Sequence, residues 1–81
     1  MLQVLRPDQI VRLKAERLRR GWSQLDLAFR SRVQPTDISR IERGRALPYP
    51  GQAARLAAAL DLSESDLLTP VAAAPSTDED A

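Results

Sequence analysis

One segment of the sequence, VQPTDISRIERGR at residues 33–45, combines a helical repeat with a carboxylate on its apolar side. At about 100° per residue, Glu42 lies on the same face as Ile38, whereas Arg40 and Arg43 lie on the opposite face. A carboxylate that points into a core must find a cation or become neutral. A fold that buries Glu42 in its charged form is therefore expected to bring a basic side chain to it.

Arg17 is the predicted partner, because it lies on the inward face of an earlier helical segment between Leu13 and Leu18. A two-pronged arginine–carboxylate bond between Arg17 and Glu42 would join the first expected helix to the third. The alternative, in which each side chain reaches solvent along its own stem, is still open at this point.

The chain reads as five short helices, and no segment reads as a strand. Ser23 with Asp26, and Ser63 with Asp66, form capping-box patterns that favour helix starts. Proline suits the first turn of a helix, and glycine suits the position after its end. The expected helices run from Pro7 to Gly21, over 24–31, from Pro35 to Gly44, over 50–60, and as one last turn with Leu67 and Leu68.

The length and composition limit what kind of protein this is. With 81 residues the chain can form one small domain, whose core leaves little room for a catalytic pocket. It contains no cysteine and no histidine, which removes disulfides, the commonest general base and most transition-metal sites. No apolar run is long enough to span a membrane, and the N-terminus lacks the pattern of a secretion signal. We therefore expect a cytoplasmic protein that is not an enzyme, holds no metal or cofactor and does not contact a membrane.

The charge is unevenly distributed, although the formal net charge is only +1. All twelve basic residues and five of the acidic residues lie between Arg6 and Arg55, a net charge of +7. The other six acidic residues follow, and they give residues 56–81 a net charge of −6. This pattern favours a polyanionic partner, although a solvated surface with an acidic tail for solubility fits equally well. By composition, residues 1–6 are an N-terminal extension, 7–68 the folded domain and 69–81 a disordered acidic tail.

The second and third expected helices are separated by a joint of about three residues, at positions 31–33. The outward face of the third helix is polar at its start and basic toward its end. A helix, a short joint and a second helix with a polar outward face form the layout of a helix-turn-helix, whose second helix enters the DNA major groove. Basic amphipathic helices are common, so this periodicity does not by itself establish DNA binding.

The segment RGWSQLDLAFRSRVQPTDISRIERGRALP, at residues 20–48, resembles the phage-repressor (Cro/Xre-type) helix-turn-helix domain. The resemblance extends over about residues 8–68, because LDLSESDLL at 60–68 is similar to the closing turn of that family. It implies an all-α, compact five-helix, lambda-repressor-like domain with the helix-turn-helix at helices 2 and 3. It also implies the Arg17–Glu42 bond and sequence-specific binding of double-stranded DNA by a homodimer. The matching residues are Arg17, Gly21, Trp22, Ser23, Gln24, Leu27, Ala28, Val33, Ile38, Ser39, Arg40, Ile41, Glu42, Arg43, Gly44 and Pro48.

The resemblance further implies that certain side chains contact DNA. Arg40 can pair with guanine through two hydrogen bonds, a contact worth roughly 1–3 kcal/mol of discrimination. Asp37 can accept a hydrogen bond from cytosine, but its charge repels phosphate. Each assignment competes with a plain solvated helix surface. The positions that match base-reading residues are Gln34, Thr36, Asp37 and Arg40, and those that match phosphate-binding residues are Ser23, Gln24, Arg43 and Arg45.

Several residues depart from the family pattern. Arg32 stands in the turn, where the family often has glycine, and a positive φ is uncommon for other residues. Pro35 replaces a side chain that often contacts DNA. Leu25 and Phe29 occupy positions that are usually polar. They either form a contact patch for a protein partner or are covered by the LQVL segment at residues 2–5, of this chain or of a partner copy, and we favour the second explanation.

These patterns lead to two functional hypotheses. The first is a transcriptional repressor or autoregulator that binds a palindromic operator as a homodimer. The second is an antitoxin or adaptor that holds a protein partner through Leu25 and Phe29 or through the acidic tail.

Overall fold

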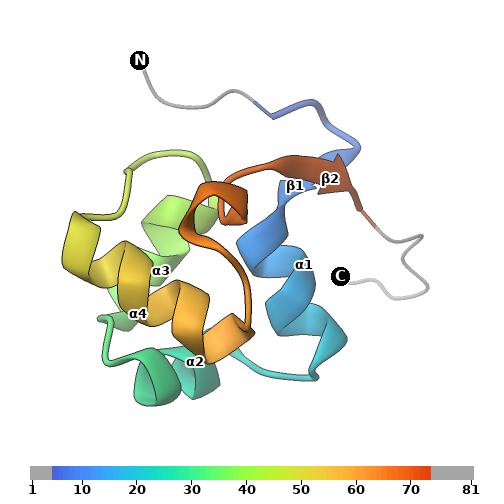
Figure 1. Cartoon of the computed structure of the whole chain (residues 1–81). Helices are drawn as coiled ribbons and strands as arrows, with labels where there is room; N and C mark the ends of the chain where they lie inside the picture. Colours follow the sequence, from blue (N-terminus) through green and yellow to red (C-terminus); the bar gives the residue numbers. More distant parts are fainter. Residues whose placement is uncertain (1–4, 74–81) are drawn as a thin grey trace.

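The structure is a computed structural model that describes residues 5–73 of the chain. Within this part, four α-helices surround one core, and a small two-stranded sheet lies beside the start of α1 (Figure 1). Along the chain the elements are β1 (Gln9–Val11), α1 (Arg12–Arg19), α2 (Gln24–Ser31), α3 (Pro35–Glu42), α4 (Pro50–Leu60), the 3-10 turn η1 (Glu64–Asp66) and β2 (Pro70–Ala72).

The starts of α2, α3 and α4 follow local signals in the sequence. Ser23 Oγ accepts a hydrogen bond from the Asp26 N–H (3.0 Å), and the Asp26 carboxylate accepts one from the Ser23 N–H (2.8 Å). The bond from the Ser23 N–H lowers the pKa of the Asp26 carboxyl, and the two bonds together complete the expected capping box. Pro35 and Pro50 are the first residues of α3 and α4, where the missing N–H would have no helical partner in any case.

The N-terminal part of the structure differs from the sequence-based expectation in two ways. The first helix begins at Arg12 rather than near Pro7, and residues 9–11 form a strand, although no strand is expected from the sequence. β1 pairs with β2 in antiparallel register, with Ile10 opposite Val71. These β-branched residues favour the extended conformation. The domain is therefore mostly helical rather than all-α.

The segment at residues 67–69 folds back beside the start of α1 and caps it. Val11 stands at the N-cap position and provides no side-chain hydrogen bond. Instead, the carbonyl oxygens of Thr69 and Leu67 accept hydrogen bonds from the Arg12 and Leu13 N–H groups, each at 2.9 Å. These bonds satisfy two donors that a helix start otherwise leaves without a partner. Because the acceptors are distant in sequence, no local pattern predicts them.

The prediction of the last helix is also wrong in its details. η1 is a single 3-10 turn, and the Ser63 hydroxyl contacts the Ser65 hydroxyl (3.2 Å) rather than making the expected capping box. The chain then passes buried Leu67 and turns back to form β2. Residues 69–73, which composition assigns to the tail, thus belong to the folded domain. Residues 74–81 of the expected tail lie outside the described residues.

The core lies where the helices meet, and α4 packs against both α1 and α2. Leu18, which is expected to widen the inward face of α1, is instead 51% exposed. The buried apolar residues are Val11, Leu13, Leu27, Val33, Ile38, Ile41, Leu56, Ala57, Leu60 and Leu67.

Arg17 of α1 and Glu42 of α3 form a buried, two-pronged ion pair. Arg17 Nε and Nη2 donate to the two carboxylate oxygens of Glu42 at 2.7 and 2.9 Å. The third nitrogen, Nη1, donates to the Trp22 carbonyl (2.8 Å), and Gln24 Nε2 donates to Glu42 Oε1 (3.0 Å). The pair thus links α1, the turn after it, α2 and α3, and it sets the rotation of α3 about its own axis.

Arg32 lies in the turn between α2 and α3 with a left-handed backbone (φ 61°, ψ 32°). Its N–H donates to the Ala28 carbonyl at 2.8 Å and closes the last turn of α2. A residue with a Cβ is strained in this conformation relative to glycine. The turn therefore has the geometry that glycine favours, although it contains arginine.

Replacing Arg17 with methionine is expected to lower the free energy of unfolding by about 3–5 kcal/mol, because Glu42 would stay buried without a cation. Urea denaturation followed through Trp22 fluorescence measures this change. The double variant Arg17→Met/Glu42→Leu removes both charges and should recover most of the loss. A single variant that stays within about 1 kcal/mol of the parent protein would contradict a buried ion pair.

Arg32→Gly is expected to raise the free energy of unfolding by up to about 1 kcal/mol, because glycine removes the left-handed strain in the turn. Arg32→Ala is the matched control, since it removes the guanidinium but keeps a Cβ at positive φ. Urea denaturation of both variants separates backbone strain from side-chain contacts. Equal effects of glycine and alanine would show that strain plays no part.

Candidate nucleic-acid interface

α2, the turn at residues 32–34 and α3 form one unit, in which α3 packs against α2. Leu27 and Ile38 contribute fully buried side chains from the two helices to the core beneath this unit. On the opposite side of α3, Thr36 and Arg40 are exposed. The unit therefore presents a helix with one anchored face and one open face.

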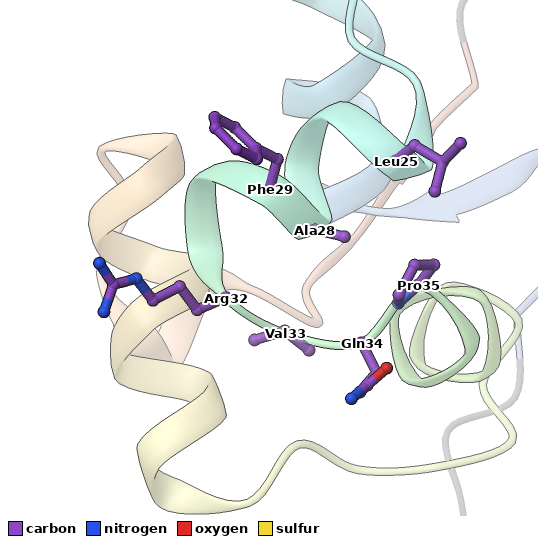
Figure 2. Close-up of a pocket in the computed structure, with 7 residues that line it drawn as sticks. All are labelled: Leu25, Ala28, Phe29, Arg32, Val33, Gln34 and Pro35. Carbon is purple, nitrogen blue, oxygen red and sulfur yellow. The ribbon is translucent and has the colours of Figure 1, made fainter.

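Three of the four candidate base-reading residues, Gln34, Thr36 and Arg40, are exposed along α3 and at its start. Figure 2 shows the Gln34 side chain pointing away from α2. Within residues 5–73, the Arg40 side chain makes no ion pair and no hydrogen bond with another residue. These side chains are therefore accessible to a ligand that approaches α3.

The fourth candidate, Asp37, is half-buried and is tied to α4. Its Oδ2 atom accepts a hydrogen bond from Gln52 Nε2 at 3.0 Å. No sequence pattern points to Gln52, because helical periodicity orders residues within one helix and says nothing about contacts between two helices. Among residues 5–73, Asp37 thus has a side-chain partner, whereas none is found for the side chains of the other three candidates.

The four candidate phosphate-binding residues lie at the two ends of the unit. Ser23 uses both its hydroxyl and its N–H in the capping box. Gln24 Nε2 binds Glu42 Oε1, so this residue braces α3. Arg43 and Arg45 follow α3 and are exposed. The two arginines are therefore the more accessible members of this set.

Two acids of the described helices, Glu16 and Glu42, form ion pairs with arginines that lie in α1 or directly after it. Glu16 forms ion pairs with Arg12, Arg19 and Arg20, with N–O distances of 3.6, 2.9 and 2.7 Å. The hydrogen bond from Arg19 lowers the pKa of Glu16, so the carboxyl stays ionised. By contrast, none of the acids described forms an ion pair with an arginine of α3 or of the loop after it. Positive charge is therefore left unbalanced beside the open face of α3.

The turn before α2 is held by arginine–aromatic contacts that the sequence patterns do not reveal. The guanidinium carbons of Arg30 and Arg20 lie 4.4 and 5.6 Å from the centre of the Trp22 ring. A cation is attracted to the face of an aromatic ring at these distances. Because Ser23 and Gln24 follow Trp22 directly, these contacts also stabilise the start of α2.

An apolar hollow of about 410 Å³ lies between α2 and the turn that leads into α3 (Figure 2). Leu25 and Phe29 stand one turn apart on α2 and are 68% and 87% exposed. Of the LQVL segment that is expected to cover them, only Leu5 is described, and it packs against the core. Residues 1–4 lie outside the described part. The other lining residues are Ala28, Arg32, Val33, Gln34 and Pro35.

Within residues 5–73, no helix has the length and apolar character needed to cross a membrane. The same stretch of chain contains no group of three acidic side chains arranged to hold a metal ion.

Comparison with known proteins agrees with this geometry. A helix-turn-helix family model matches residues 13–67. Among solved structures, the restriction-modification controller protein C.AhdI from Aeromonas hydrophila is 33% identical, with a TM-score of 0.64. That match covers 70% of this chain and 86% of the C.AhdI chain. No curated protein matches the sequence.

Two further solved structures are similar. The clp gene regulator ClgR from Corynebacterium glutamicum is 34% identical with a TM-score of 0.60, over 68% of this chain and 58% of that one. The hypothetical transcription factor NHTF from Neisseria is 33% identical with a TM-score of 0.62, over 72% and 67% of the two chains. The family model spans well over half of the sequence and includes both α2 and α3, so the chain belongs to the Xre/Cro-type helix-turn-helix family.

Proposed function

We propose that this DNA-binding transcriptional regulator is a repressor or autoregulator that binds a palindromic operator as a homodimer. The supporting observation is the open face of α3, where Arg40 has no partner within residues 5–73 while Ile38 and Glu42 hold the opposite face. A helix anchored in this way can enter a major groove without losing its packing. We propose that the protein is cytoplasmic, because its DNA target lies in the cytoplasm. We propose no enzymatic activity or cofactor for it.

In the proposed complex, the start of α3 lies in the major groove. Arg40 pairs with guanine O6 and N7, which discriminates against other bases by roughly 1–3 kcal/mol. Gln34 bonds adenine or contacts a thymine methyl group, and Thr36 contacts a neighbouring base edge. Asp37 accepts a hydrogen bond from the amino group of cytosine.

The proposed phosphate contacts flank the groove. Arg43 and Arg45 follow α3, and no acid within residues 5–73 forms an ion pair with either. Ser23 and Gln24 stand at the N-terminus of α2, where the helix dipole attracts an anion. The Ser23 hydroxyl accepts a hydrogen bond in the capping box, so its own proton is the group that can donate to a phosphate. These contacts add affinity for any DNA sequence, so binding should weaken steeply as salt is added.

We propose a homodimer because the open face of a single α3 is too short to specify a long DNA site. One α3 contacts only a few base pairs, and helix-turn-helix proteins lengthen their sites by binding two half-sites about one helical turn apart. Two similar structures are named a controller protein and a gene regulator, which supports a role in gene control.

A second candidate function, that of an antitoxin or adaptor, is supported by the open apolar hollow. Exposed apolar side chains such as Leu25 and Phe29 commonly mark a protein contact. In this proposal they, or the acidic tail, hold a protein partner. Capture of one partner from the native host by the parent protein, but not by Leu25→Glu/Phe29→Glu, would support it. Identical captures by both proteins would argue against a role for this patch.

Selection from a random DNA pool should return a palindrome with two half-sites about one helical turn apart. Arg40→Ala should relax the preference at one position in each half-site and weaken the best site by roughly 1–3 kcal/mol. Arg43→Ala should weaken all sequences about equally and reduce the slope of log affinity against log salt by about 1. Arg12→Ala is the matched control, because Arg12 pairs with Glu16 on α1. A parent protein without sequence preference at physiological salt would refute the repressor proposal.

A further inference from the structure

Asp37 and Gln52 connect the first turn of α3 to the first turn of α4. Gln52 Nε2 donates a hydrogen bond to Asp37 Oδ2 at 3.0 Å. The other end of the same amide, Gln52 Oε1, accepts a hydrogen bond from the Tyr49 N–H at 3.1 Å. A backbone N–H can only donate, so the amide oxygen must face Tyr49 and the NH2 group must face Asp37. The start of α4 thus aims a fixed donor at the carboxylate.

The Asp37 carboxylate is bonded to α4 and not to the start of its own helix. Asp37 is the third residue of α3, a position from which a carboxylate commonly turns back to the N–H of the residue before the helix. That residue is Gln34, and within residues 5–73 no hydrogen bond joins its N–H to Asp37. Gln52 holds the carboxylate on the side of α4 instead.

We infer that Gln52 is a positioning residue, which holds Asp37 Oδ2 so that Oδ1 accepts a hydrogen bond from a base in the groove. The inference rests on the proposed role of α3 in reading DNA. Gln52 uses one oxygen of the carboxylate, and no donor within residues 5–73 occupies the other. Cytosine fits this acceptor best, because it presents an amino donor alone. Adenine places the acceptor N7 beside its amino group, and guanine and thymine present acceptors that a carboxylate repels.

This contact acts on specificity more than on affinity. A carboxylate near the groove repels the neighbouring phosphates, which offsets the hydrogen bond that it gains. Its main effect is therefore to exclude bases that present an acceptor. Without Gln52, the Asp37 carboxylate is free to turn back to the Gln34 N–H, and this exclusion is lost.

The first test compares the sequences that the parent protein and Gln52→Ala select from random DNA. Gln52→Ala should reduce the preference for cytosine at one position per half-site by roughly fivefold or more. A change of roughly fivefold corresponds to the lower end of the discrimination that one base contact provides. Asp37→Ala should lose the same preference, and the position read by Arg40 should stay unchanged in both variants. Gln9→Ala is the matched control, because Gln9 also accepts from a backbone N–H but lies in β1.

A second variant tests the direction of the hydrogen bond. In Asp37→Asn, the NH2 group of Gln52 can only donate, so it should hold the oxygen of the new amide and leave that amide's NH2 group for the groove. The preferred base should then change from cytosine to one that presents an acceptor, guanine or thymine, by roughly fivefold or more. The double variant Asp37→Asn/Gln52→Ala should not show this change, because its amide can turn either way.

The outcomes separate this inference from the proposed function. If Gln52→Ala lowers the melting temperature but keeps the cytosine preference, the contact only joins α3 to α4 and the inference is wrong. If Asp37→Ala keeps that preference while Arg40→Ala relaxes its own position, Asp37 does not read DNA, yet the regulator proposal stands. A parent protein with no sequence preference would overturn the proposed function and the inference together.

Discussion

Glu42 cannot be buried alone, and much of the domain is arranged around its pairing with Arg17. Moving a carboxylate out of water costs on the order of several kcal/mol unless a cation and hydrogen bonds replace the water. Here Arg17 bonds both oxygens of Glu42, and Gln24 adds a third hydrogen bond. The pair requires α1, α2 and α3 to meet at one point. It therefore determines which face of α3 turns outward.

The placement of the acids explains how a chain with a net charge of +1 presents a basic surface. Glu16 balances arginines of α1, and Glu42 balances Arg17 in the interior. Asp26 is used at the start of α2, and Asp37 is held by α4. The arginines at the end of α3 form no ion pair within residues 5–73, so positive charge gathers on one face. Asp37, which α4 holds, remains half-buried in the first turn of α3.

Local patterns were sufficient for the part of the fold that includes α2 and α3. The capping box at Ser23 and the prolines at Pro35 and Pro50 define helix starts through contacts within one turn, so neighbouring residues contain the information. The pairing of Arg17 with Glu42 could be foreseen as well, because each lies on the inward face of its own helix. The candidate base-reading positions came from a family resemblance. Three of them are exposed, and the fourth has a partner that the resemblance did not indicate.

Contacts between distant segments determined what the patterns missed. β1 and β2 have three residues each, too few for alternation to reveal a strand, and they form a sheet only by pairing with each other. The same pairing brings the Thr69 carbonyl to the N–H of Arg12, which is why α1 begins there and not near Pro7. Gln52 could become the partner of Asp37 only after α4 had packed against the other helices. A sequence pattern expresses what a residue prefers within its own helix, whereas these contacts depend on where separate elements lie in space.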